Sequence, residues 1–202
     1  MTSYPPEPWN LAGQAHVSAW RIPAKELPAL PGGVSPITVR GQAFVFVAWI
    51  DYQERGQLAY HELLSATAVR GKRTTASITE IWVDSEVSLA GGRALWGIPK
   101  DLAALDFAGG RAFTGSAATT DDWIATAAFS ARGGLPLALP GGFDIAQTLD
   151  GRLKHSAVAS KAIPQLASAS WNINPAGPLG YLAGRHPFVS LNLRDFTLRF
   201  GG

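Results

Sequence analysis

The sequence contains no cysteine, which excludes disulfide bonds, thiolate metal ligands and cysteine nucleophiles. An excess of one charge is also lacking, because 17 basic residues are balanced by 15 acidic ones and the formal net charge is +2. Since no Lys/Arg cluster marks a surface that could follow a phosphate backbone, we expect no nucleic-acid partner. The histidines lack the spacing of metal ligands, so we expect no metal site at His16, His61, His155 or His186.

Long apolar runs are missing as well, since no segment approaches the roughly 18 residues that a membrane-spanning helix needs. The first ten residues hold three prolines and lack the apolar stretch of a signal peptide. We therefore expect no membrane partner and a cytoplasmic location, which the absence of cysteine fits. Without an internal repeat or a linker, the 202 residues predict a single domain over residues 1–202.

Glycine and proline are abundant, with 22 and 14 copies, and they separate short segments of alternating apolar residues. This pattern predicts a mainly β (α+β) fold, a curved antiparallel sheet or β-barrel with a few short helices. A change of apolar parity near Asp195 predicts a β-bulge. We expect a loop over residues 133–142, and strands over residues 15–20, 43–50, 58–69, 74–83, 112–117, 123–131, 153–162, 168–173 and 188–200.

The segment Asp84–Trp96 carries the strongest helical signal. Asp84 is a suitable N-cap residue and Glu86 favours the first turn, because both place negative charge at the helix N-terminus. Gly97 followed by Pro99 is a stop signal. Shorter helical turns are expected at residues 24–30 and 177–184.

Lys100 follows this stop signal directly. Pro99 fixes its own φ and restricts Ile98, so the backbone that leads into Lys100 is well defined. The neighbours Trp96 and Leu102 are apolar, and an apolar setting favours the neutral amine, which is a nucleophile towards carbonyls. The same residues also fit an ordinary surface lysine after a turn, and the local sequence leaves both interpretations open.

Alternation along residues 58–69 places Glu62 on the same strand face as Tyr60 and Leu64, with His61 on the opposite face. Glu62 is the one carboxylate on that otherwise apolar face. A buried carboxylate is costly unless it is paired or functional. A half-exposed face, or simple pairing with an arginine, would explain the pattern equally well.

Two segments together resemble the signature of acetoacetate decarboxylases. They are Tyr60-His61-Glu62 and the stretch IWVDSEVSLAGGRALWGIPKDLA, residues 81–103. That signature combines a strand glutamate, an aspartate-led helix with glycine-arginine, and a proline-lysine pair. The resemblance is strongest over residues 43–107 and extends more weakly over nearly the whole chain.

The resemblance implies a barrel-like fold around an apolar pocket, with Lys100 as the catalytic Schiff-base lysine and Glu62 as a catalytic pocket glutamate. Desolvation as a means of activating such a lysine is known from acetoacetate decarboxylase itself. Tyr60, Arg93 and Trp96 are the expected substrate-binding residues. The resemblance also implies that no cofactor is needed, that the partner is a small carbonyl compound, and that the protein forms a homo-oligomer.

Three positions depart from the family pattern. Asp101 stands where the decarboxylases have a second lysine, and an anion there would stabilise the ammonium form of Lys100 if the side chains approached. Val47 falls at the position of a second pocket glutamate, and Gly13 lies near that of the substrate arginine. Arg21, Arg40 and Arg93 are the arginines that could replace the latter by a different route.

These residues predict a lyase that acts on a small carbonyl compound through a Lys100 imine, in decarboxylase, aldolase or dehydratase chemistry. Because of the departures, we do not expect acetoacetate itself to be the substrate. A non-covalent barrel is the alternative, either a cyclase or isomerase of a hydrophobic, polyketide-like metabolite or a ligand-binding protein. A non-catalytic assembly protein is a third reading, which no feature of the sequence favours.

Overall fold

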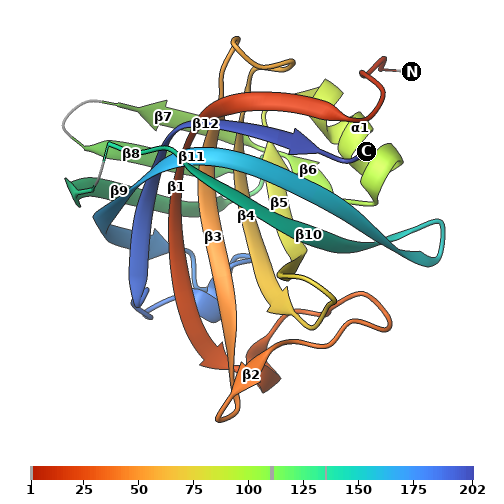
Figure 1. The fold of residues 1–202 in the computed structure, drawn as a ribbon. Helices are drawn as coiled ribbons and strands as arrows, with labels where there is room; N and C mark the ends of the chain where they lie inside the picture. The colour runs from red at the N-terminus through yellow and green to blue at the C-terminus, as the bar shows by residue number, and fades with distance from the viewer. Residues whose placement is uncertain (1, 110–111, 135) are drawn as a thin grey trace.

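A computed structural model describes residues 2–109, 112–134 and 136–202, and most of them form β-strands (Figure 1). One α-helix, α1 (Glu86–Trp96), accompanies the strands, so the predicted mainly β fold class is confirmed. The strands are β1 (Trp9–Pro23), β2 (Thr38–Val39), β3 (Gln42–Tyr52), β4 (Tyr60–Val69), β5 (Thr75–Val83), β6 (Lys100–Leu102), β7 (Ala104–Ala108), β8 (Phe113–Ala118), β9 (Trp123–Gly133), β10 (Leu139–Leu149), β11 (Arg152–Ile173) and β12 (Val189–Phe200).

The strands join in one sheet with the order β10-β5-β4-β3-β1-β12-β11-β9-β8-β7. An additional pairing between β10 and β11 closes the first part of this path into a ring. Most pairs are antiparallel, but β5 pairs in parallel with both β10 and β6. The long strand β11 belongs to both parts of the sheet, because its first half pairs with β10 and its last half with β9.

Strands β1, β3 and β4 separate two hydrophobic cores, because their side chains alternate between the two faces. One face packs under the extension made by β7, β8 and β9, where Trp20, Val47 and Leu63 are fully buried. The other face lines the inside of the ring, where Tyr52 and Tyr60 are buried. The strand parity that separates Glu62 from His61 therefore decides which side of the sheet each of them faces.

Several expectations were incomplete. Residues 133–142 were expected to form a loop, yet β9 reaches Gly133 and β10 begins at Leu139; residue 135 lies outside the described residues. The two strands expected at 153–162 and 168–173 are one continuous strand, because Pro164 pairs with Leu193 of β12 instead of ending the strand. The bulge near Asp195 is confirmed, since this residue has a φ of 47° and the register shifts beside it.

Helix α1 begins one residue later than expected. Its N-cap is Ser85, whose side chain accepts a hydrogen bond from the backbone N–H of Ser88. Asp84 is not the cap, because its carboxylate binds the backbone N–H and the ring of His61 on β4. Gly97 ends the helix in the left-handed conformation, with a φ of 67°, as expected for a glycine stop. Short 3-10 turns occur at Ala24–Glu26 and Gly180–Leu182, where helical turns were expected.

Helix α1 lies beside one end of the ring, next to both chain termini (Figure 1). Among the described residues, no helix combines the length and the apolar character required to cross a membrane. The helix instead packs against β6 and β10. This position brings its inner face close to the first residue of β6, which is Lys100.

Candidate active site

Lys100 enters the ring because β6 pairs in parallel with β5, where Lys100 stands opposite Ile81. Its side chain is buried, with only 5% of its surface exposed. The ammonium nitrogen Nζ donates to Oε2 of Glu62 at 2.7 Å, to Oγ of Ser88 at 2.8 Å and, more weakly, to the hydroxyl of Tyr60 at 3.4 Å. The structure thus brings three predicted site residues together, and Glu62 faces the same interior as Lys100, as predicted.

Two tyrosines complete the surroundings of this buried ion pair. The hydroxyl of Tyr52 donates to Oε1 of Glu62 at 3.3 Å, and Nζ of Lys100 lies 5.0 Å from the centroid of the Tyr60 ring. Burial raises the pKa of both phenols well above the usual value, and the negative charge of Glu62 raises it further. Both tyrosines therefore stay protonated, and Tyr60, whose hydroxyl already contacts Nζ, can donate a hydrogen bond to an oxyanion near Lys100.

The glycine pair in α1 has a packing role at this site. A Cβ atom on Gly92 would lie 2.7 Å from Cδ and 2.8 Å from Cε of Lys100. Gly92 therefore lets the lysine side chain pass directly over the helix backbone. Ser88 lies four residues earlier, so it shares the same helix face and reaches Nζ. Ser88 was not predicted as a site residue, although its spacing of four residues from Gly92 was a usable signal.

Asp101 does not approach the ammonium of Lys100. Its side chain is 67% exposed and forms an ion pair with Arg93. Nε of Arg93 also donates to the backbone carbonyl of Lys100 at 2.7 Å. Arg93 therefore holds β6 against α1 from outside, while its guanidinium is directed at Asp101 rather than at Nζ.

The other residues named from the sequence lie away from Nζ. The indole of Trp96 donates to Glu7 at 2.7 Å and packs edge-on against Trp9. Arg21 lies over the ring of Phe188, at 4.5 Å from its centroid. Arg40 stands in the turn between β2 and β3 with a φ of 51°. Among the described residues, none of the three replacement arginines forms a hydrogen bond or ion pair with the side chain of Lys100 or Glu62, since Arg93 reaches only the backbone carbonyl of Lys100.

The family departures have structural counterparts. Val47 is fully buried in the core on the far side of β3, whereas the residues of β3 that share the face of Glu62 are apolar or aromatic: Phe44, Phe46, Ala48, Ile50 and Tyr52. A Cβ on Gly13 would lie 1.9 Å from the backbone oxygen of Asp51, so this position excludes any side chain. This part of the ring therefore carries neither a second carboxylate nor an arginine from those positions.

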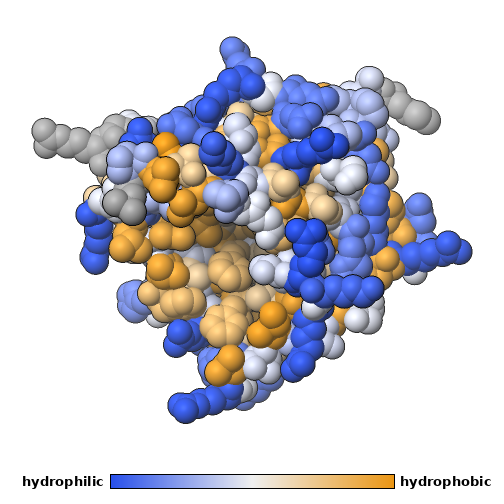
Figure 2. Space-filling view, viewed as in Figure 1, coloured by the Kyte–Doolittle hydropathy of each residue, from blue (hydrophilic) through white to orange (hydrophobic). Residues whose placement is uncertain are grey.

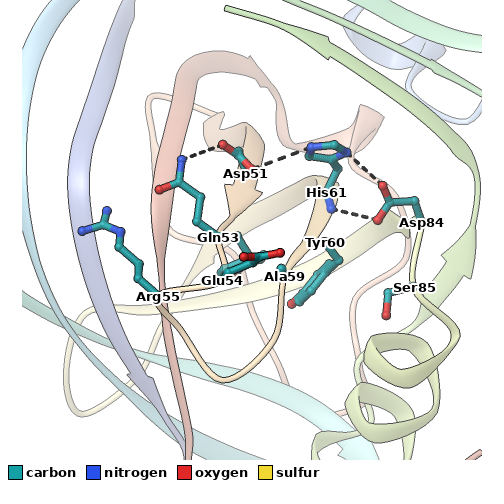
Figure 3. Close-up of a pocket in the computed structure, with 10 residues that line it drawn as sticks. Asp51, Gln53, Glu54, Arg55, Ala59, Tyr60, His61, Asp84 and Ser85 are labelled. Carbon is teal, nitrogen blue, oxygen red and sulfur yellow. Dashed lines mark hydrogen bonds and ion pairs between the residues drawn. The ribbon is translucent and has the colours of Figure 1, made fainter.

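An open depression of about 770 Å³ lies at the end of β3 and β4 (Figure 3). Tyr52 and Tyr60 line it and separate it from Lys100. On its other side His61 lies between two carboxylates, with Nδ1 at 2.9 Å from Asp84 and Nε2 at 3.7 Å from Asp51. Within the residues that the structure describes, no group of three His, Cys, Asp or Glu side chains could hold a metal ion.

The family model of acetoacetate decarboxylase matches residues 1–166, which is most of the chain. The chain belongs to the acetoacetate decarboxylase family. Comparison with curated proteins gives no match. This family member is nevertheless similar in fold to several solved structures, all of them below 20% identity.

Acetoacetate decarboxylase from Legionella pneumophila aligns with a TM-score of 0.73 and 19% identity, over 100% of this chain and 88% of its own. The enduracididine biosynthesis enzyme MppR gives a TM-score of 0.71 and 18% identity, over 98% and 87%. An acetoacetate decarboxylase-like enzyme from Sphingomonas wittichii RW1 gives 0.67 and 16%, over 96% and 91%. At these identities the likeness establishes the shared fold.

Proposed function

We propose that this family member is a lyase that forms an imine between Lys100 and a small carbonyl compound. The observation that carries the proposal is the buried contact of 2.7 Å between Nζ of Lys100 and Glu62. A lysine and a carboxylate are costly to bury, and here both lie inside the ring, among apolar side chains. Strongly desolvated ionisable pairs are concentrated at functional sites.

The ion pair defines how the nucleophile would form. Transfer of one proton from Nζ to Oε2 of Glu62, along the existing hydrogen bond, leaves a neutral amine and a neutral carboxyl group. The amine attacks the carbonyl carbon, and the carboxyl of Glu62 returns the proton to the oxygen, which becomes a hydroxyl group. Glu62 then takes a second proton from the attacking nitrogen and delivers it to this hydroxyl, which leaves as water while the protonated imine forms. Ser88 and Tyr60 stabilise the oxygen of the intermediate through their hydroxyl groups, because both already contact Nζ.

The protonated imine then serves as the electron sink for cleavage beside the former carbonyl. Loss of carbon dioxide, or of an aldehyde, leaves an enamine that takes a proton on carbon before hydrolysis releases the product and Lys100. The relative MppR has been solved with the condensation product of pyruvate and imidazole 4-carboxaldehyde. That complex supports carbonyl chemistry on this fold, and the chemistry needs no cofactor beyond the lysine.

A non-covalent role is the second candidate, and one observation favours it. The ammonium of Lys100 already has three hydrogen-bond partners, which stabilise its charged, non-nucleophilic form. In that case the ion pair would only anchor β6 and the ring would bind or cyclise an apolar compound by orientation.

Reductive trapping separates the two candidates. The protein is incubated with butanone and sodium cyanoborohydride, which reduces an imine to a stable amine, and the adduct is located by peptide mass spectrometry. We expect one adduct, on Lys100, and none on Lys100→Met. Lys72→Met is the control, because Lys72 is exposed in the turn between β4 and β5. Adducts spread over surface lysines, or none at all, would leave the non-covalent role as the better account.

A further inference from the structure

We infer that the open inner face of the ring binds an extended apolar chain carried by the carbonyl substrate. This inference rests on the proposed imine at Lys100 and names the class of substrate: a ketone or aldehyde with a long or bulky apolar substituent. It starts from the registers of the strands, which align the side chains that share one face.

Successive cross-strand partners form a row of side chains that runs across the sheet and ends on Lys100. From the far strand inwards, each residue pairs with the next across β11, β12, β1, β3, β4, β5 and β6. The row consists of Leu166, Leu191, Val17, Ala48, Leu64, Ile81 and Lys100. Six apolar side chains thus lead to the reactive nitrogen along a single face.

The two adjacent rows have the same character. One consists of Val189, Ala19, Phe46 and Ala66, and the other of Leu193, Ala15, Ile50 and Glu62. Glu62 is the one charged residue in these two rows, and it belongs to the site. The next charged side chain on this face of β1 is Arg21, which stacks on Phe188 where the face meets solvent. The strand spacing of about 4.8 Å makes the path from Lys100 to Val17 about 19 Å long.

The outer part of this apolar face is accessible, whereas Ala48 and Ile81, which lie nearer Lys100, are buried. Phe46 is 37% exposed and Leu166 is 57% exposed, while Val17 and Leu64 are half-buried. Figure 2 shows a hollowed, predominantly apolar surface in the region of β1, β3 and β12, with hydrophilic residues at its margins. An exposed apolar surface of this kind marks a binding site rather than an ordinary protein surface.

The shape of the surface selects its occupant. A two-fold interface pairs the same patch on both copies and therefore requires a self-complementary surface, but two hollows do not fill each other. A narrow apolar chain does fit a hollow, and its end would reach Lys100 because the central row ends there. A short anionic substrate would leave the hydrophobic face unused.

The test compares ketones that differ only in chain length. Trapping with cyanoborohydride is measured for butanone and for 2-decanone, and calorimetry measures the binding of 2-decanol, which has no carbonyl and cannot form an imine. Each buried methylene contributes a factor of about four in affinity, so partial burial of the chain should favour 2-decanone by at least about tenfold. We expect Phe46→Asp to abolish that preference, so that the ratio of 2-decanone trapping to butanone trapping falls to about one.

Leu153→Asp is the matched control. Leu153 is 40% exposed, close to the 37% of Phe46, but it lies at odd spacing from the buried Val158 and so faces outward from the ring. It should alter neither trapping nor 2-decanol binding.

The outcomes separate this inference from the proposed function. Trapping of both ketones at the same rate, unaffected by Phe46→Asp, would overturn the apolar-chain site and leave the imine intact. Binding of 2-decanol that Phe46→Asp removes, without any trapping, would support the apolar site and overturn the imine. If Phe46→Asp instead dissociates an oligomer and leaves 2-decanol binding unchanged, the face is an interface and the inference is wrong.

Discussion

Lys100 lies so close to Gly92 that the helix backbone and the lysine side chain leave no room for a methyl group between them. The consequence is that Gly92 acts as a positioning residue for Nζ. Since a glycine inside a helix costs up to about 1 kcal/mol relative to alanine, a contact of this kind explains why α1 contains one here.

We therefore expect Gly92→Ala to keep the fold and to displace Lys100. The added methyl gains helix propensity but pushes Cδ and Cε away, which lengthens the contact between Nζ and Glu62. Trapping of butanone should fall at least about tenfold, while the midpoint of thermal unfolding changes by only a few degrees. Gly32→Ala is the control, because a Cβ at Gly32 meets nothing within 4 Å. Normal trapping by Gly92→Ala would show that Lys100 does not depend on this contact.

The buried pair should behave as one unit in stability measurements. Lys100→Met leaves the carboxylate of Glu62 buried beside Tyr52 alone, and removal of one partner from a buried ion pair costs about 3–5 kcal/mol. The double variant Lys100→Met/Glu62→Gln should recover a large part of that loss, because no uncompensated charge remains. Urea denaturation measures both.

The exposed pair of Arg55 and Asp195 supplies the comparison, since both side chains are more than 40% exposed. Asp195→Asn should cost less than about 1 kcal/mol. Strictly additive losses in Lys100→Met/Glu62→Gln would mean that the two residues do not interact energetically, against the distance of 2.7 Å.

Acetoacetate should be a poor substrate. The described part of the chain places no guanidinium in contact with the side chain of Lys100 or Glu62, so a short anionic substrate gains no partner for its carboxylate. We expect carbon dioxide release at the background rate from the native protein, and also from Asp101→Lys, because position 101 faces solvent and Arg93. Robust release by the native protein would contradict this.

The same geometry predicts that Asp101 has little influence on the nucleophile. Asp101→Ala should change the trapping of butanone by less than about twofold, because an exposed charge is screened by solvent. A loss or gain of tenfold would show that the charge at position 101 acts on Nζ through the backbone or through Arg93.

The two buried tyrosines predict how stability depends on pH. Their pKa values in the folded protein are raised above the unfolded value of about 10, so the folded state holds these protons when the unfolded state releases them. Stability should therefore be full below pH 10 and fall above it, by up to about 1.4 kcal/mol per pH unit for each phenol. Thermal unfolding between pH 9 and 11 measures this, and Tyr52→Phe should fall less steeply than the native protein.

A homo-oligomer stays a prediction from the family resemblance. Light scattering coupled to size exclusion should give a molar mass that is a multiple of 21.3 kDa at micromolar concentration. Exposed apolar side chains outside the ring strands, such as Val39 on β2 and Leu137 before β10, are suitable for such contacts. A monomeric mass would contradict the prediction.

Local sequence patterns predicted the parts of this protein that depend on neighbouring residues. Alternation along β4 correctly separated Glu62 from His61, and the glycine-proline signal located the end of α1 before Lys100. The β11 strand was predicted as two strands, over residues 153–162 and 168–173, and the distant pairing with β12 explains why it continues through Pro164.

The site itself was only partly accessible to such reasoning. The parallel pairing that places Lys100 beside Ile81, and the pairing of Asp101 with Arg93, depend on how α1 returns the chain to β5. Asp84 was a reasonable N-cap by residue type, but His61, which is distant in sequence, competes for its carboxylate. Local preference cannot reveal which of two polar partners a side chain will choose.

The ring closes unequally. Strands β10 and β11 share eleven residue pairs, whereas β10 and β5 share two, Asp144 with Thr75 and Ile145 with Ala76. The β5–β10 junction is therefore the weakest strand pairing in the ring, because the fewest backbone hydrogen bonds must break there for the two strands to separate. Because β5 also pairs with β6, transient separation of β5 from β10 would loosen the strands that hold Lys100. A bulky molecule could then enter the ring between β5 and β10 without the rest of the sheet unfolding.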